Sequence, residues 1–246
     1  MIRIGRCTYD RQGKRTDPSY PGFTPIIILM KGHNKWGSLG PYELKDDNGI
    51  ILENYWQGAK CYAFVPETIQ RYSRWDSRII WQHSSEIHYD QDRDQILPAY
   101  WTWRNKLMHN LFAVRYPVGF NHRHKCLFAI KDNDVIHRKL DYIQARKEIY
   151  VQKYCELVRQ QQKFKELEQR LDRGENLLII EVDGPHQQSL NYYRDNYNVN
   201  DDFIEQNTML ALDENLHIML NDDKHPFGHG YCLAIALLEL DYLADL

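Results

Sequence analysis

A long run of helically spaced apolar residues, from Val135 to Leu171, constrains the fold of this chain more than any other stretch. Apolar side chains recur there at intervals of three, four or seven residues, which is the spacing of one face of an α-helix. The pattern predicts one long helix, or two helices separated near the polar run "RQQQK". Asp134 is placed to cap its start and Gly174 to end it. The pattern is carried by Ile136, Leu140, Ile143, Tyr150, Tyr154, Leu157, Phe164, Leu167 and Leu171.

Shorter apolar runs on both sides of this helix predict strands and further helices. The runs "RIGRCTYD", "FTPIIILMKG" and "NLLIIEVDG" have the apolar or alternating composition of strands. Loop chemistry dominates "GSLGPYELKDDNG", which is rich in glycine and ends in a turn. Additional helices are expected over residues 52–65, 66–75, 201–213 and 230–243.

Residues 76–134 differ from the rest and are interpreted as an insertion. The segment holds three Trp (Trp81, Trp101 and Trp103), the turn-rich patch "HYDQDRDQ" and a hairpin-like run, "FAVRYPVGFNHRHKCLFAI". We therefore predict an α+β fold that is mainly α. It is a single domain over residues 1–246, in which a helical core carries short strands and an inserted β-hairpin segment at about 76–134.

Composition and cysteine usage narrow the class of protein. The 246 residues are 43% hydrophobic, which is enough for a substantial core. The five cysteines are scattered and form no C-x-x-C pair, which indicates reduced thiols rather than a disulfide framework or a zinc site. No signal sequence is evident, and the longest apolar stretch, Tyr231–Leu240, is too short to cross a bilayer. We expect a cytoplasmic protein with no membrane partner.

Charge is distributed unevenly along the chain. Residues 100–139 contain eight Arg and Lys against two acidic residues, whereas residues 201–246 contain ten acidic residues and one Lys. The basic segment, with Arg115, Arg123 and Lys125, is a candidate surface for an anionic ligand such as DNA. Alternatively, the two segments face each other across the fold.

A polar set within "ENYWQGAK" is the first candidate site. Glu53, Trp56, Gln57 and Lys60 are spaced i, i+3, i+4 and i+7, so a helix would place all four on one face. An indole can stack on a base, an amide can read its edge, and the two charges can act on a bond or a phosphate. The alternative is an exposed Glu–Lys helix surface with a partly buried Trp.

Two further segments contain candidate catalytic acids and a possible anion-binding site. Glu181 and Asp183 alternate with apolar residues in "IIEVDGPH", so on a strand both would point the same way and could hold different protonation states. A solvated strand face is the alternative. Gly228 and Gly230 precede an apolar helix, where backbone N–H groups can bind an anion.

No metal or cofactor site is expected. Asp222, Asp223, His225 and His229 suggest metal ligands, but Pro226 and the neighbouring glycines argue against a helical ligand pair. The "HRH" run at 122–124 lacks a nearby carboxylate. Phosphate-binding loops, dinucleotide fingerprints and the hydrolase and zinc-protease motifs are also absent from the sequence.

Three segments, in order, resemble the NADAR (NAD- and ADP-ribose-associated) superfamily of N-glycosidases. They are "SLGPYELKDDNGIILENYWQGAKCY", "QKYCELVRQQQKFKELEQRLDRGENLLIIEVDGP" and "DDKHPFGHGYCLAIALLE". The resemblance covers roughly residues 35–65 and 140–240. Phe227 stands where the family has Trp, its aspartate is Asp223 or Asp222, and the Asn-x-x-Gly of its last helix is missing.

The resemblance implies cleavage of a base–sugar bond in an ADP-ribosylated or nucleotide-like substrate, such as ADP-ribosyl-guanine in DNA. It implies Glu53 as one catalytic group and Asp183 or Asp223 as the other, with no cofactor. Lys60 would bind a phosphate or tune the carboxylate, and Trp56 would stack on the base. The remaining substrate-binding residues would be Tyr42, Gln57, Glu181, Phe227, Gly228 and Gly230.

Two other functions remain open at this stage. The same oxocarbenium chemistry would serve a glycosyl or ADP-ribosyl transferase, in which a hydroxyl or a base replaces water. The departures from the family pattern are also compatible with a non-catalytic protein that binds ADP-ribose or nucleic acid.

Overall fold

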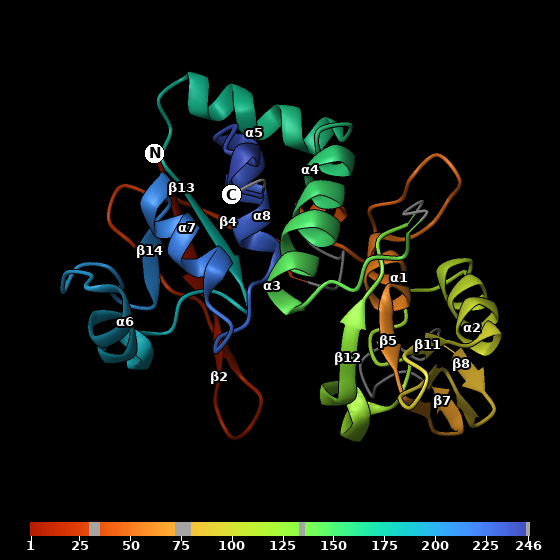
Figure 1. The fold of residues 1–246 in the computed structure, drawn as a ribbon. Helices are drawn as coiled ribbons and strands as arrows, with labels where there is room; N and C mark the ends of the chain where they lie inside the picture. Colours follow the sequence, from red (N-terminus) through yellow and green to blue (C-terminus); the bar gives the residue numbers. More distant parts are fainter. Residues whose placement is uncertain (30–34, 72–79, 133–135, 245–246) are drawn as a thin grey trace. The chain divides into compact units, whose positions relative to one another are not determined.

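A computed structural model describes the chain except for residues 30–34, 72–79, 133–135 and 245–246 (Figure 1). The described residues form two compact units. The first unit comprises Met1–Glu43 and Val151–Leu246, and the second unit comprises Leu44–Tyr150. Within the described parts of the chain, we find no helix whose length and apolar character would let it cross a bilayer.

A four-stranded sheet is the centre of the first unit. Its order is β14 (Thr208–Leu210), β1 (Ile2–Arg6), β13 (Leu177–Glu181) and β4 (Thr24–Ile27). The last three strands are parallel, and β14 pairs antiparallel with β1 at one edge. Every residue of β13 is buried, as expected for the apolar run of a central parallel strand. The three predicted strands are thus confirmed.

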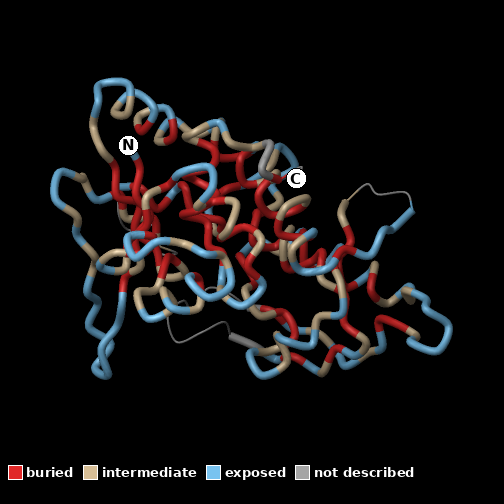
Figure 2. Tube along the Cα trace, turned by 60° about the vertical axis from the view of Figure 1, so that its left-hand side comes forward, coloured by how far each residue is buried: buried red, intermediate tan, exposed pale blue. Residues whose placement is uncertain are grey.

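Helices cover this sheet and bury it. The apolar helix α8 (His229–Leu237) packs on β13 and β1 and lies beside α4 (Gln152–Val158) (Figure 1). Because α8 is apolar on all sides, it suits a fully enclosed position. Figure 2 colours the chain by burial, with buried stretches in red. The other elements of the first unit are α5 (Gln162–Asp172), α6 (Leu190–Tyr197), α7 (Asp213–Asn221) and the short pair β2 (Thr8–Tyr9) and β3 (Arg15–Thr16).

The predicted long helix is present in pieces. It begins with α3 (Tyr142–Ala145), passes through a π-helical stretch at Arg146–Val151, and continues as α4 and α5. The predicted break near "RQQQK" is confirmed, since α4 ends at Val158 and α5 starts at Gln162. The predicted start was wrong, because Asp141 caps α3 in a reciprocal capping box with Gln144. Asp134 lies outside the described residues.

The described residues of the second unit combine α3 and two earlier helices with small two-stranded sheets. Its helices α1 (Leu52–Gly58) and α2 (Pro98–Met108) pack together, and β5 (Lys60–Tyr62) pairs with β12 (Cys126–Ala129). An aromatic core that includes Tyr100 and Trp103 lies beneath them. The other pairs are β6 (Phe64–Val65) with β9 (Glu86–Ile87), β7 (Thr68–Arg71) with β8 (Ile80–His83), and β10 (Tyr89–Asp90) with β11 (Gln95–Ile96).

Four local expectations were wrong, and pairing or packing explains them. The helix expected over 52–65 ends at Gly58, where an added Cβ would lie 2.9 Å from Met108 Cγ, and the chain continues as β5. Within 66–75, residues 68–71 form β7, which pairs with β8, and residues 72–75 lie outside the described part of the chain. The expected helix at 201–213 is largely turn and β14, with helices on either side. The expected hairpin provides only β12, whose partner is β5, and α2 was missed.

The predicted insertion, 76–134, lies inside the second unit, which starts earlier, at Leu44, and ends later, at Tyr150. The mixture of helices and small sheets agrees with an α+β class. A NADAR-like core remains a prediction.

Candidate functional site

The polar set predicted in "ENYWQGAK" forms a connected cluster in the second unit, here termed the α1 cluster (Glu53, Trp56, Gln57 and Lys60). Gln57 Nε2 donates a hydrogen bond of 2.8 Å to Glu53 Oε1. Lys60 Nζ donates one of 3.0 Å to Gln57 Oε1. Glu53 is only 6% exposed although it is an acid. The Gln57 amide therefore links the carboxylate to the ammonium group.

An aromatic surface lies beside this polar line. Lys60 Nζ is 4.7 Å from the centroid of the Trp56 ring, within cation–π range. The Trp56 ring lies 5.2 Å from that of Tyr150, at 45°. Burial lowers the pKa of Lys60, while the nearby Cys126 and Glu53 raise it in part. Tyr150 is a residue that the sequence reasoning missed, because no local spacing connects it to α1.

The arrangement differs from the predicted helix face in one respect. Lys60 is the first residue of β5 rather than part of α1, yet its side chain still reaches Gln57. Chemically, the cluster offers a positioned carboxylate, an ammonium group whose pKa is lowered, and an indole beside that ammonium group. These are the group types that act on a charged sugar attached to a flat base.

A second cluster lies at the carboxyl end of the parallel sheet in the first unit and is termed the sheet-edge cluster (Arg6, Glu181, Asp183 and His229). Glu181 is the last residue of β13 and is 1% exposed. Its Oε1 accepts a 3.0 Å hydrogen bond from the backbone N–H of Gly230, at the start of α8. The predicted anion-binding site at this helix start is therefore occupied by a side chain of the protein itself.

The two glycines of that turn are required by the Glu181 carboxylate. A Cβ added at Gly228 would lie 2.0 Å from Glu181 Oε2, and one added at Gly230 would lie 2.6 Å from Oε1. No side chain fits at either position without displacing the carboxylate. The glycines predicted to bind substrate thus pack against an internal acid.

Glu181 and His229 favour their neutral forms. Burial and the neighbouring Asp183 hold the pKa of Glu181 well above its usual range, against the opposing effect of the Gly230 and Tyr231 N–H groups and Arg6. Burial lowers the pKa of His229, whose Nε2 donates to Ile28 O and whose Nδ1 lies 3.4 Å from Glu181 Oε2. Arg6 was not among the predicted site residues, and His229 was considered only as a metal ligand, because the pairing of β1 with β13 and the packing of α8 bring them to Glu181.

The alternating pattern predicted that Asp183 and Glu181 share one face of a strand, and this prediction was wrong. β13 ends at Glu181, and Asp183 follows in a bend, half-buried. Its charge still acts on Glu181, Tyr231 and His229. Proximity is therefore retained although the strand geometry was wrong.

Asp222 and Asp223 are neighbours in the sequence but lie in different environments. Asp223, the predicted catalytic residue, is exposed and lies 3.4 Å from Lys224 Nζ. Asp222 is fully buried and accepts hydrogen bonds from the Tyr192 and Tyr193 hydroxyl groups at 2.9 and 2.7 Å. The Asp222 carboxylate thus anchors α6.

Two further predicted substrate residues belong to the first unit. Phe227 is buried and stacks on Tyr231, with ring centroids 4.8 Å apart. Tyr42 is half-buried in a turn.

The predicted nucleic-acid residues form an aromatic and basic loop in the second unit. Arg123 lies 3.6 Å from the centroid of the exposed Phe120 ring, and Arg115 lies 5.0 Å from that of Tyr116. The Tyr116 and Phe120 rings pack edge to face at 5.2 Å. Lys125 is exposed at the end of the short 3-10 helix Phe120–Lys125. Flat cations on aromatic rings are suited to stacking on bases.

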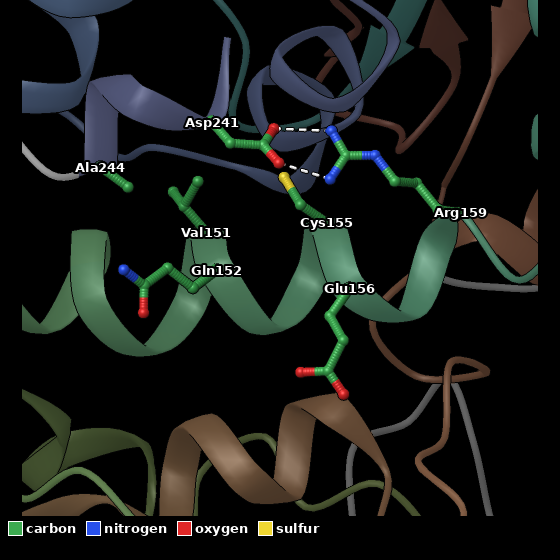
Figure 3. Close-up of a pocket in the computed structure, with 7 residues that line it drawn as sticks. All are labelled: Val151, Gln152, Cys155, Glu156, Arg159, Asp241 and Ala244. Carbon is green, nitrogen blue, oxygen red and sulfur yellow. Dashed lines mark hydrogen bonds and ion pairs between the residues drawn. The ribbon is translucent and has the colours of Figure 1, made fainter. Parts of the chain in front are cut away.

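A small pocket in the first unit is lined by residues in and beside α4 and by residues of the C-terminal segment (Figure 3). Its volume is about 220 Å³, and Arg159 and Asp241 point toward each other across its wall, with Arg159 Nη2 2.7 Å from Asp241 Oδ1. Burial raises the pKa of Cys155 in the same wall to about 12, so its thiol is protonated. Ligand pockets usually exceed roughly 300 Å³. This pocket contains none of the predicted site residues.

Comparison with family models, with curated proteins and with solved structures found no match to this chain. The geometry gives two separate candidate sites, one within each unit. The α1 cluster keeps the four predicted residues together. The sheet-edge cluster joins Glu181 and Asp183 to Gly228 and Gly230.

Proposed function

We propose that this protein is an N-glycosidase that hydrolyses the base–sugar bond of an ADP-ribosylated or nucleotide-like substrate. The observation that carries the proposal is the hydrogen-bonded line from Glu53 through Gln57 to Lys60 beside the Trp56 ring. A buried acid, an amide and a cation in this order are costly to maintain on a helix surface. The family resemblance of the same residues supports the assignment.

Each member of the α1 cluster has a role in the proposed reaction. Cleavage of a C–N glycosidic bond passes through an oxocarbenium-like transition state, which a carboxylate stabilises directly or by activating water. Glu53 takes this role, and Gln57 orients its carboxylate through the 2.8 Å bond. Lys60 binds a phosphate of the substrate, and Trp56 stacks on the base.

Protonation of the departing base requires an acid that holds its proton near neutral pH. The family resemblance gives this role to Asp183 or Asp223, and the roles proposed for the α1 cluster do not depend on that choice. Asp223 is a weaker candidate because it is exposed and paired with Lys224.

Mass spectrometry of a substrate panel tests the proposal. The panel contains ADP-ribosylated DNA, ADP-ribosylated nucleosides, NAD and pyrimidine ribosyl phosphates, each incubated with the wild type, with Glu53→Gln and with Glu67→Gln. Glu67 is an exposed acid of the same unit and serves as the matched control. We expect free base and free sugar from the wild type and Glu67→Gln, and neither from Glu53→Gln. Equal turnover by Glu53→Gln would refute the assignment, and a new glycoside in place of free sugar would indicate transfer.

The second candidate function is non-catalytic binding of nucleic acid. It is favoured by the Arg115, Tyr116, Phe120 and Arg123 loop, in which guanidinium groups lie on aromatic rings. It predicts that single-stranded DNA binds with a salt-dependent affinity and remains intact. Replacing Arg115, Arg123 and Lys125 by Ala should reduce the slope of log K against log salt by about 0.7 for each lost phosphate contact.

A further inference from the structure

Two histidines and a glutamate converge in the second unit, outside the α1 cluster. β8 ends at His83, two serines reverse the chain, and β9 begins at Glu86. His88 follows two residues after Glu86 in extended chain, so both side chains lie on the same side while Ile87 is exposed. The sequence "HSSEIH" thus brings three possible metal ligands to one place.

Strand pairing fixes the backbone of all three residues. His83 pairs with Thr68 of β7, and Glu86 pairs with Val65 of β6. The His88 N–H donates a 3.0 Å hydrogen bond to Ala63 O. The three side chains therefore start from a rigid base, which a metal site requires.

The ligand atoms are already close together. Glu86 Oε1 lies 2.6 Å from His83 Nε2 and 2.6 Å from His88 Nε2. The three potential ligand atoms lie within 4.8 Å of one another. The side chain of His88 is fully buried, that of His83 is 10% exposed and that of Glu86 is 28% exposed. The carboxylate is thus the part that can move to admit an ion.

Without a metal ion, hydrogen bonds alone leave one buried ring nitrogen of His88 without a hydrogen-bond partner among the described residues. If His88 Nε2 carries the proton and donates to Glu86, its Nδ1 becomes an acceptor. Nδ1 is buried and makes no hydrogen bond to any residue that the structure describes. The opposite tautomer turns Nδ1 into a donor among aromatic rings, with Trp103 at 5.0 Å and Tyr100 at 5.9 Å, and N–H groups interact favourably with such rings. That tautomer directs the Nε2 lone pair toward the Glu86 carboxylate, and a metal ion bound between the two groups would relieve the repulsion.

We propose that His83, Glu86 and His88 bind a divalent transition-metal ion of the Zn²⁺ type. Imidazole and carboxylate are ligands that Zn²⁺ accepts, at about 2.0–2.2 Å. Tetrahedral geometry with such bonds places ligand atoms about 3.3 Å apart, so the carboxylate has to withdraw by less than about 1 Å. Three protein ligands leave one position for water or another ligand.

The surroundings suit such an ion. Trp81 stacks on the His83 ring with centroids 6.0 Å apart and a 10° interplanar angle, and Trp103 lies against His88. An apolar shell of this kind orients the ligands and limits the access of water. The ion would tie β8 to β9 and so stabilise the small paired strands of this unit.

Metal binding by the purified full chain tests the proposal, with Zn²⁺ and Co²⁺ as probes. The chain is stripped with a chelator, its Zn²⁺ affinity is measured by competition with a coloured chelator, and its melting temperature is recorded with and without Zn²⁺. Co²⁺ adds a visible absorption band that reports coordination geometry. We expect one ion per chain, a higher melting temperature with Zn²⁺, and a tetrahedral Co²⁺ spectrum.

The decisive variants are His83→Ala and Glu86→Gln, because His88 is fully buried and its replacement is prone to misfold. Each should weaken Zn²⁺ binding by at least about tenfold, and each should lose the Zn²⁺-dependent rise in melting temperature. The control is the double variant His122→Ala/His124→Ala, which removes the "HRH" histidines and should bind like the wild type. Equal Zn²⁺ binding by wild type, His83→Ala and Glu86→Gln would overturn the proposal, as would loss of binding in the control alone.

Discussion

Glu53 and Glu181 are both buried acids, but the protein holds them in different ways. Glu53 receives its hydrogen bond from the side chain of Gln57, which in turn is bonded to Lys60. Glu181 receives its hydrogen bond from a backbone N–H and packs against two glycines at the start of α8. Side chains can be changed with little effect on the fold, whereas backbone contacts are part of the fold itself. We therefore expect Glu53 to matter mainly for activity and Glu181 mainly for stability.

The largest expected effect is the loss of catalytic activity when Glu53 is replaced. Glu53→Gln should reduce base–sugar cleavage by about 10²–10⁴-fold, because a carboxylate that acts as general base or charge stabiliser contributes this much. Its free energy of unfolding should change by less than about 1 kcal/mol, since Gln keeps the shape and the contact with Gln57. Activity assays and urea unfolding on the same preparation measure both. A loss of stability that explains the loss of activity would remove the distinction.

The second prediction concerns the packing of Glu181. Gly228→Ala should destabilise the protein by about 3 kcal/mol, because the added Cβ overlaps the carboxylate. Urea unfolding measures the change. The double variant Gly228→Ala/Glu181→Ala should recover part of the loss, since it removes the group that is struck. If Glu181→Ala does not reduce the loss of stability caused by Gly228→Ala, the Glu181 carboxylate is not what the added Cβ strikes.

The third prediction is a pH dependence caused by Glu181. Its pKa is raised in the folded state and about 4.3 when unfolded, so between these values the folded protein keeps a proton that the unfolded chain has lost. The stability that this proton provides is complete below about pH 4.3 and is lost as the pH rises through the folded pKa, by about 1.4 kcal/mol for each unit between the two pKa values.

Unfolding free energies of the wild type and Glu181→Gln between pH 4 and 8 test this slope. The difference between them should change in favour of Glu181→Gln as the pH rises. His229 acts in the opposite direction, because its lowered pKa makes stability rise with pH up to about 6.5. Its contribution is common to both proteins and cancels to first order. A pH-independent difference would contradict the raised pKa.

The smallest effect should come from Lys60. Lys60→Met keeps the apolar stem over Trp56 but removes the charge, so kcat/KM should fall about tenfold through a higher KM while kcat stays near that of the wild type. Stability should be unchanged or slightly higher, because burial disfavours the charged form of Lys60. A fall in kcat at unchanged KM would assign Lys60 to the transition state rather than to phosphate binding.

Patterns within a single element were good guides to this protein. The run "NLLIIEVDG" identified the central strand, because four consecutive apolar residues are compatible with burial on both faces. The spacing in "ENYWQGAK" placed Glu53, Trp56 and Gln57 on one face of α1. Lys60 joins them although the helix ends at Gly58, since the first residue of β5 is still near the last turn.

Contacts between distant segments were not predictable in this way. The π-helical stretch that carries Tyr150 is far from α1 in the sequence, and Arg6 and His229 reach Glu181 only because β1, β13 and α8 pack together. Residues 68–71 were predicted to be helical but form β7. Pairing with β8 satisfies the backbone hydrogen-bonding groups and outweighs a weak local helix propensity. The run "HSSEIH" carries a spacing signal that the sequence analysis did not use. Glu86 and His88 are two positions apart, and His83 stands just before the two serines of the turn.

The sequence by itself determined the three parallel strands of the central sheet, the broken helical segment and the membership of the α1 cluster, because each depends on residues a few positions apart. Only the tertiary structure decided that Glu181 is sealed against Gly228 and Gly230, that Asp222 rather than Asp223 is buried, and that His83, Glu86 and His88 meet. Burial sets the protonation and pairing of these groups. Burial is a property of packing between segments, which local spacing does not encode.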